Sequence, residues 1–256
     1  MNVLAPLAAR YASWLALPAS ETNATEDPAL VRAMPVILRI ERELPDRTPL
    51  LEAAATAALA VCLDPRAVDV EGEWHSEVTT WISGRIRKVS RRARGAHWVA
   101  AQNYPGVTVT VDGASARALV PGLVSETPRD ISRLQISGSD LPLDTPGPPP
   151  PGVPVLWLNP SVPLTAGKAA AQVGHASMIL AAMLDPADLK SWAATDYRCA
   201  VRTPTQELWD ALHPGADPEG AWRDRAVIAV RDAGFTEIAP GTITVLAQWS
   251  GEAVRD

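Results

Sequence analysis

The sequence predicts an α/β protein: a C-terminal domain with a mixed four-stranded sheet flanked by helices, preceded by an N-terminal α/β domain. Three observations support this prediction. Short apolar runs typical of buried strands alternate with longer alanine-rich stretches typical of helices. A proline-rich segment divides the chain in two. The stretches that follow Pro35 and Pro154 read as the same succession of elements.

Length and composition favour a folded protein that does not enter a membrane. The chain has 256 residues, 47% hydrophobic and 20% charged, which suffices for one large domain or two ordinary ones. Cys62 and Cys199 form no C-x-x-C pair, which favours a reducing compartment. The first twenty residues lack a basic start and follow helical spacing, so we expect a docked helix rather than a signal peptide. No run reaches the ~18 apolar residues needed to cross a bilayer, and we expect a cytoplasmic protein.

The segment DLPLDTPGPPPPG, residues 140–152, can continue neither a helix nor a central strand, because proline lacks the N–H donor and fixes φ. We interpret it as a semi-rigid linker between a domain at 1–139 and a domain at 153–256. Charge divides at the same place: residues 1–139 have a net charge of 0, and the remainder carries the whole net charge of −6.

In the first domain, a buried apolar run predicts a strand at 35–40, followed by an alanine-rich helix at 47–63. Helical spacing of apolar residues predicts a second helix at 75–93, and several strands are expected between 96 and 137.

In the second domain, the pattern predicts a strand at 153–158, a helix at 166–184 and a further helical segment at 187–194. A strand at 197–202 follows, then a helix capped by Thr203 or Thr205. Two strands, at 226–231 and in TITVLAQW, close the domain.

The two domains read as distant copies of one unit. Each begins with a buried strand, a proline-containing loop, an alanine-rich helix and a closing Leu-Asp-Pro. Aligned on that tripeptide, Arg47 lies opposite Lys168, Leu51 opposite Gln172 and Ala54 opposite His175. The first domain is then a degenerate copy without the polar residues, and the two domains form an intramolecular pseudo-dimer. The alternative is that alanine-rich helices resemble each other by chance.

The helix at 166–184 carries polar residues that stability does not require. Thr165 is a good N-cap, and Gly167 and Lys168 lie in the first turn, where N–H groups and a positive charge favour an anion. Lys168, Gln172 and His175 share one face at helical spacing. The alternative is a surface lysine, a surface glutamine and a half-buried histidine.

The segment VRDAGFTEIAPGT, residues 230–242, places a carboxylate and a hydroxyl after a strand. Asp232 and Thr236 can face a cleft at the strand's carboxyl end, where α/β sheets bind ligands. The alternative is that both side chains cap local turns.

Together these segments resemble the type II peptidyl-tRNA hydrolases. That family's helix motif G-K-x-A-A-Q-x-x-H-A is matched from Gly167 to Ala176, and its motif R-D-A-G-x-T-x-I-A-P-G-T from Arg231 to Thr242. The resemblance covers about residues 153–250. It implies a mixed four-stranded sheet flanked by helices and hydrolysis, without a metal or other cofactor, of the ester joining a peptide to the 3′ end of tRNA. It also implies that Lys168 and Asp232 form the central pair, supported by Gln172, Thr236, His175 and Thr242.

A cluster of basic residues lies outside the segment that shows this resemblance. The stretch RIRKVSRRAR, residues 85–94, contains six cations on what the pattern predicts to be the outer face of a helix at 81–94. These residues are Arg85, Arg87, Lys88, Arg91, Arg92 and Arg94. We expect this helix to contact the tRNA backbone, because the second domain is acidic and tRNA is a polyanion. The alternative is an ordinary solvated face.

The sequence thus predicts a peptidyl-tRNA hydrolase acting on peptidyl-tRNA or another N-blocked aminoacyl ester of tRNA. The alternative function is a catalytically weak binding scaffold that kept the fold. Retention of Lys168, Asp232 and Thr236 favours the enzyme, and the uncharged VPLTA before Gly167 favours the scaffold.

Overall fold

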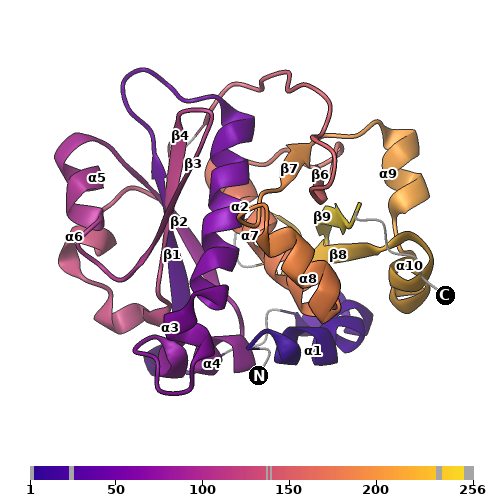
Figure 1. Cartoon of the computed structure of the whole chain (residues 1–256), viewed down its shortest axis with the longest axis horizontal. Helices are drawn as coiled ribbons and strands as arrows, with labels where there is room; N and C mark the ends of the chain where they lie inside the picture. The colour runs from indigo at the N-terminus through magenta and orange to yellow at the C-terminus, as the bar shows by residue number, and fades with distance from the viewer. Residues whose placement is uncertain (1–2, 23–25, 137, 139, 235–237, 251–256) are drawn as a thin grey trace.

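The computed structural model describes residues 3–22, 26–136, 138, 140–234 and 238–250. It confirms the α/β class: two mixed sheets lie on either side of a central pair of helices (Figure 1). Among the described residues, none of the helices is long and apolar enough to cross a membrane.

The first sheet is built around β1 (Arg32–Arg39). It pairs in parallel with β2 (Lys88–Ala93) and antiparallel with β4 (Ala114–Leu119), which in turn pairs antiparallel with β3 (Gly106–Val111). The order is therefore β2-β1-β4-β3, and the short β5 (Gly122–Leu123) pairs with the start of β1.

The second sheet repeats this arrangement. Its central strand β6 (Val155–Leu158) pairs in parallel with β7 (Ala200–Arg202) and antiparallel with β9 (Ile243–Gln248), which pairs antiparallel with β8 (Val227–Arg231). The order β7-β6-β9-β8 matches the order of the first sheet in position and direction. The mixed four-stranded sheet expected for the C-terminal part is confirmed.

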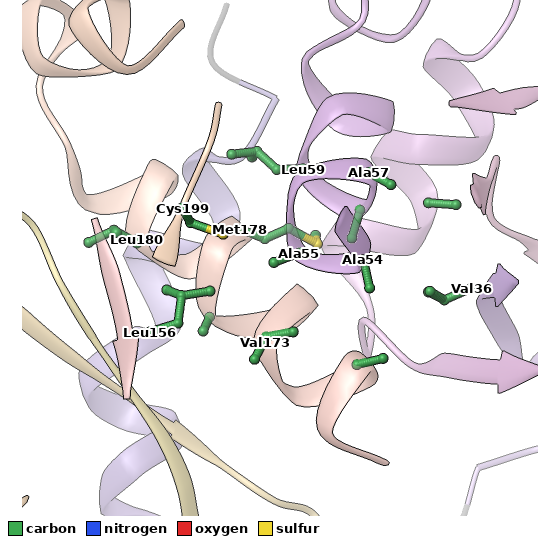
Figure 2. Close-up of a cluster of buried hydrophobic side chains, with 14 of the residues drawn as sticks. Val36, Ala54, Ala55, Ala57, Leu59, Leu156, Val173, Met178, Leu180 and Cys199 are labelled. Atoms are coloured by element: carbon green, nitrogen blue, oxygen red, sulfur yellow. The ribbon is translucent and has the colours of Figure 1, made fainter. Parts of the chain in front are cut away.

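The central helices are α2 (Arg47–Leu63) and α7 (Ala166–Met183), and each follows the central strand of its own sheet. Helix α2 packs on β3 and β4, α7 packs on β8 and β9, and the two helices pack on each other. Figure 2 shows their side chains meeting in the main hydrophobic core. Because both helices are covered on nearly every side, most of their residues are buried and apolar, apart from polar side chains such as Lys168, Gln172 and His175 on one face of α7.

Small residues allow α2 and α7 to approach closely. The Ser177 hydroxyl donates to the carbonyl of Ala55 across the interface at 2.8 Å. A Cβ at Gly174 would lie 3.2 Å from that of Ala58 and 3.0 Å from Cε of Lys88. Gly174 therefore makes room both for α2 and for a lysine that arrives from β2.

The remaining helices cover the outer faces and ends of the sheets. Because side chains alternate along a strand, Ile37 faces α5 and α6, whereas Val36 and Leu38 face the central helices. In the second sheet, Val227 and Ala229 likewise face α9. These elements are α3 (Pro65–Val68), α4 (His75–Ser83), α5 (Gly95–Ala101), α6 (Arg129–Ser132), α8 (Pro186–Ala193), α9 (Gln206–Leu212), α10 (Pro218–Arg225) and the 3-10 turns Ala19–Glu21, Pro28–Leu30 and Val124–Glu126.

The N-terminal segment forms the expected docked helix, α1 (Ala5–Ala16). The Tyr11 hydroxyl accepts a hydrogen bond from Ala229 N on the outer edge of β8, at 2.8 Å. Arg231 donates to the carbonyls of Trp14, Leu15 and Leu17, where a cation is favoured by the helix dipole. Arg10 donates to the carbonyl of Ser83 in the first half at 3.0 Å. Helix α1 thus contacts both halves.

The proline-rich segment 140–152 packs on both halves as well. The carboxylate of Asp144 accepts from the amide and hydroxyl of Thr48 at the start of α2, at 2.9 and 2.8 Å. Arg202 of β7 donates to the carbonyl of Gly147 at 2.8 Å. Because the main core also includes residues from both halves, the division at this segment and the pseudo-dimer remain predictions.

The predicted helix at 75–93 is wrong beyond its first half. Helix α4 ends at Ser83, the Gly84 amide caps it by donating to the carbonyls of Thr80 and Trp81, and the chain then enters β2. Ile86, Val89 and Ala93 fit a helical period, but pairing with β1 requires an extended chain here. The helix predicted at 81–94 therefore does not exist.

Other boundaries differ less. The strand predicted at 197–202 is limited to β7. Of the two predicted caps of α9, Thr205 rather than Thr203 is the N-cap, and its hydroxyl accepts a hydrogen bond from Leu208 N. Helix α10 was not predicted.

Candidate active site

Lys168 and Asp232 form an ion pair between α7 and the end of β8. The Nζ atom of Lys168 lies 2.5 Å from Oδ2 of Asp232. The side chains are only 12% and 5% exposed, so the pair is shielded from bulk water. This is the pair that the two sequence motifs predict, although the residues lie 64 positions apart.

Local backbone geometry fixes both partners. Thr165 caps α7 by accepting from the amide of Lys168 at 3.2 Å, which sets the first helical turn. Beyond β8, the amide of Asp232 donates to the carbonyl of Thr242 at 2.8 Å. The amide of Gly234 donates to Oδ1 of Asp232 at 2.8 Å, and Gly234 has φ +81° with Pro240 packed against it. A side chain at Gly234 would collide with Pro240, so this turn requires glycine.

Gln172 connects the carboxylate to the second sheet. Its Nε2 donates to Oδ2 of Asp232 at 2.8 Å, and its Oε1 accepts from the hydroxyl of Thr244 on β9. Gln172 and Thr244 are 3% and 0% exposed. The hydrogen bond from Thr244 fixes the amide orientation, so that the NH2 group faces Asp232. Sequence reasoning missed Thr244; its only signal was a hydroxyl between apolar residues near the start of the last strand.

His175 lies one turn further along α7 and contacts a residue of the first half. Its Nδ1 is 3.1 Å from Nζ of Lys88 on β2, and Nζ also lies 5.1 Å from the ring centroid of Trp81. Burial lowers the pKa of Lys88 to about 7. Burial, followed by the charges of Lys88 and Lys168, lowers the pKa of His175 well below its usual range. His175 is therefore neutral at physiological pH.

These groups line a cavity of about 520 Å³ that lies between the two halves. The second half contributes Lys168, Gln172, His175 and Asp232. The first half contributes side chains of α1 together with the chain that leads into β2. The cations on this side are Arg10, Arg85, Arg87 and Lys88. The volume lies in the range of small-molecule sites.

The structure brings together most of the predicted catalytic residues. Lys168, Gln172 and Asp232 are hydrogen-bonded, and His175 and Gly167 line the same cavity. Thr242 contributes its backbone to the Asp232 turn, while its hydroxyl donates to the carbonyl of Ala239. Thr236 lies outside the described residues.

The basic stretch 85–94 does not form the predicted cationic helix face. Arg85 and Arg87 pair with Glu26, Lys88 contacts His175, and Arg91 donates to the carbonyls of Ser132 and Leu134. Arg92 donates to the carbonyl of Gly138, and Arg94 is exposed at the start of α5. In a strand, successive side chains point to opposite faces, so the six cations are distributed instead of forming one stripe.

Among the described residues, no group of three or more His, Cys, Asp or Glu side chains is placed to hold a metal ion.

The comparison with protein families supports the same part of the chain. Residues 153–252 match the family described as peptidyl-tRNA hydrolase PTH2. The matched segment contains Lys168, Gln172, His175, Asp232 and Thr244, whereas α1 and β2 lie outside it. The C-terminal part of the chain, from residue 153 to residue 252, is therefore similar to the peptidyl-tRNA hydrolase PTH2 family, and the match covers less than half of the chain.

Proposed function

We propose that this protein hydrolyses the ester bond between a peptide, or an N-blocked amino acid, and the 3′ end of tRNA. The observation that carries this proposal is the shielded Lys168–Asp232 pair, which Gln172 positions on the wall of a cavity. The pair lies in the segment that matches the PTH2 family.

Asp232 is the group that activates water. Its carboxylate accepts hydrogen bonds from Lys168, Gln172 and the amide of Gly234, which fix its orientation. An ionised carboxylate has about four lone-pair sites, so it can also accept a hydrogen bond from a water molecule. As that water attacks the acyl carbon, Asp232 takes its proton.

Lys168 stabilises the negative charge that develops on the carbonyl oxygen. Its ammonium is fixed beside Asp232, and the N-terminus of α7 adds the positive end of the helix dipole. When the tetrahedral intermediate collapses, the bond between the acyl carbon and the ribose oxygen breaks. The proton held by Asp232 passes to the ribose oxygen, which regenerates the carboxylate.

The first half supplies positive charge next to this site. Arg10, Arg85 and Arg87 line the cavity from α1 and from the chain before β2. The PTH2 segment itself is acidic, and tRNA is a polyanion. These arginines are the cations through which the terminal phosphates of tRNA approach the site.

The test is release of an N-acetylated amino acid from tRNA by the full chain and by two matched variants. Asp232→Asn reduces kcat/KM by about 10²-fold or more, because the proton acceptor is lost. Asp112→Asn, on the exposed turn between β3 and β4 of the first half, is the control and retains wild-type activity. Binding of tRNA without release by the wild-type protein would instead support the scaffold function.

A further inference from the structure

The cavity extends well beyond the Lys168–Asp232 pair into an apolar region. The side chains of Ile179 on α7, Ile86 and Val89 near the start of β2, and Tyr11 and Trp14 on α1 line it. Ile179 continues the α7 face that carries Lys168, Gln172 and His175, so the apolar region is continuous with the polar cluster.

These apolar side chains are incompletely covered by the protein itself. Trp14, Ile86, Val89 and Ile179 are all partly exposed, and Ile136 at the same cavity is 59% exposed. A cavity of about 520 Å³ with mainly apolar walls and a few convergent polar groups is typical of a site for an apolar ligand group.

Helix α1 is held rigidly enough to act as a wall of this cavity. Arg231, which directly precedes Asp232, binds the carbonyls at the C-terminus of α1. Tyr11 bonds to β8 and Arg10 bonds to the end of α4, so α1 is attached to both halves. The walls formed by α1 and β2 lie outside the segment that matches the PTH2 family, so the family match does not account for this region.

We propose that this region is an acyl pocket, which receives a large apolar N-acyl group or side chain of the ester while its carbonyl lies at Lys168 and Asp232. The proposal rests on the proposed function and adds the substrate class. Esters of tRNA with a bulky apolar acyl part are then preferred over esters with a small one. Arg10, Arg85 and Arg87 line the same cavity, and cations there favour the polyanionic part of the same substrate.

The test uses tRNA that carries glycine blocked with acetyl, butanoyl or octanoyl groups. The full chain hydrolyses the octanoyl ester with a kcat/KM at least about 10-fold above that of the acetyl ester, since each buried methylene adds to binding. Ile179→Trp, which fills the pocket, lowers this octanoyl-to-acetyl ratio towards 1. Val99→Trp, at a 65% exposed position on α5, is the matched control and retains the wild-type ratio. Equal kcat/KM for all three esters would overturn the proposal.

Direct binding separates this proposal from the proposed function. N-octanoylglycine binds the wild-type protein in calorimetry, and Ile179→Trp weakens its affinity at least about 10-fold, whereas Ile179→Ala, which enlarges the pocket, does not. If no ester is hydrolysed but this binding pattern holds, the function fails and the pocket stands. If adenosine displaces N-octanoylglycine, the cavity receives the terminal nucleotide and the acyl pocket is wrong.

Discussion

The two halves of the chain share one strand order, yet Gln172 and His175 on the central helix of the second half are aligned with the apolar residues Leu51 and Ala54 of the first half. In the first half, β3 and β4 are joined by the tight turn at Asp112 and Gly113. In the second half, residues 232–242 separate β8 from β9, and this longer connection directs Asp232 to α7. The candidate site therefore depends on one connection and a few side chains, and the arrangement of strands alone does not provide it.

The positions aligned with the cluster are structural in the first half. Leu51 and Ala54 are buried in the main core, where Gln172 and His175 line a cavity. Arg47, opposite Lys168, is 6% exposed and donates to the carbonyl of Leu164 at 2.8 Å, just before α7. The first half therefore supports the site in the second half, through Arg47, through Lys88 and through the walls of the cavity.

Large effects on stability and on activity are expected when Leu51 and Gln172, which are aligned, are each replaced by the residue type of the other. Leu51→Gln buries an amide in the apolar core and lowers the free energy of unfolding by about 2–5 kcal/mol, as measured by urea denaturation. Gln172→Leu removes the hydrogen bond that connects Asp232 to Thr244. A hydrogen bond to a charged group is worth about 1.5–3 kcal/mol, so kcat/KM falls about 10- to 100-fold.

Leu51→Met is the control for Leu51→Gln and lowers the free energy of unfolding by less than about 1.5 kcal/mol, because it preserves volume and apolarity. A Gln172→Leu protein with full activity would show that the amide does not position Asp232.

A smaller effect on stability is expected at Arg47, which is aligned with Lys168. Arg47→Ala leaves the carbonyl of Leu164 without this buried donor, so the free energy of unfolding falls by about 1–3 kcal/mol. Its effect on hydrolysis is smaller than that of Lys168→Ala, because Arg47 acts on the start of α7 and not on the substrate. An Arg47→Ala protein that unfolds at the wild-type urea midpoint would contradict the structural role.

A pH dependence of stability is expected from Lys88. Burial lowers the pKa of Lys88 to about 7, whereas the unfolded chain has the ordinary value of about 10.4. Between these values the unfolded state binds more protons than the folded state, so this contribution to stability rises with pH from about 7 to about 10. Below about 7 Lys88 is protonated in both states, and this contribution becomes constant.

Urea denaturation at pH 7 and pH 9 measures this rise. The rise is reduced in Lys88→Met and retained in Lys190→Met, a change at an exposed position on α8. Loss of the Lys88 charge also raises the pKa of His175, which NMR titration of the imidazole detects. An identical rise in wild type and Lys88→Met would contradict the buried position of the amine.

The sequence predicted the elements whose patterns are local and strong. The apolar run at β6 and the alanine-rich runs of α2 and α7 were predicted within one or two residues. Three of the side chains that form or line the site, Lys168, Gln172 and Asp232, were identified because two motifs place them at defined helix and turn positions.

The failures have one physical origin, which is pairing across the fold. Residues 85–93 fit a helical period, and only the partner strand β1 makes them extended. The same pairing places Lys88 beside His175, a contact between residues 87 positions apart that no local pattern indicates. The role of Thr244 could not be predicted for a similar reason, because it depends on the register that places β9 against α7.

The most direct test of the account is single-turnover release of N-acetylglycine from tRNA by Lys168→Ala, by Asp232→Asn and by the double variant. We expect Lys168 and Asp232 to act as one unit. Each single change therefore reduces the rate by about 10²-fold or more, and the double variant is little slower than the worse single one. A double variant that retains the wild-type rate, with both halves folded, would show that the ester is hydrolysed elsewhere in the molecule.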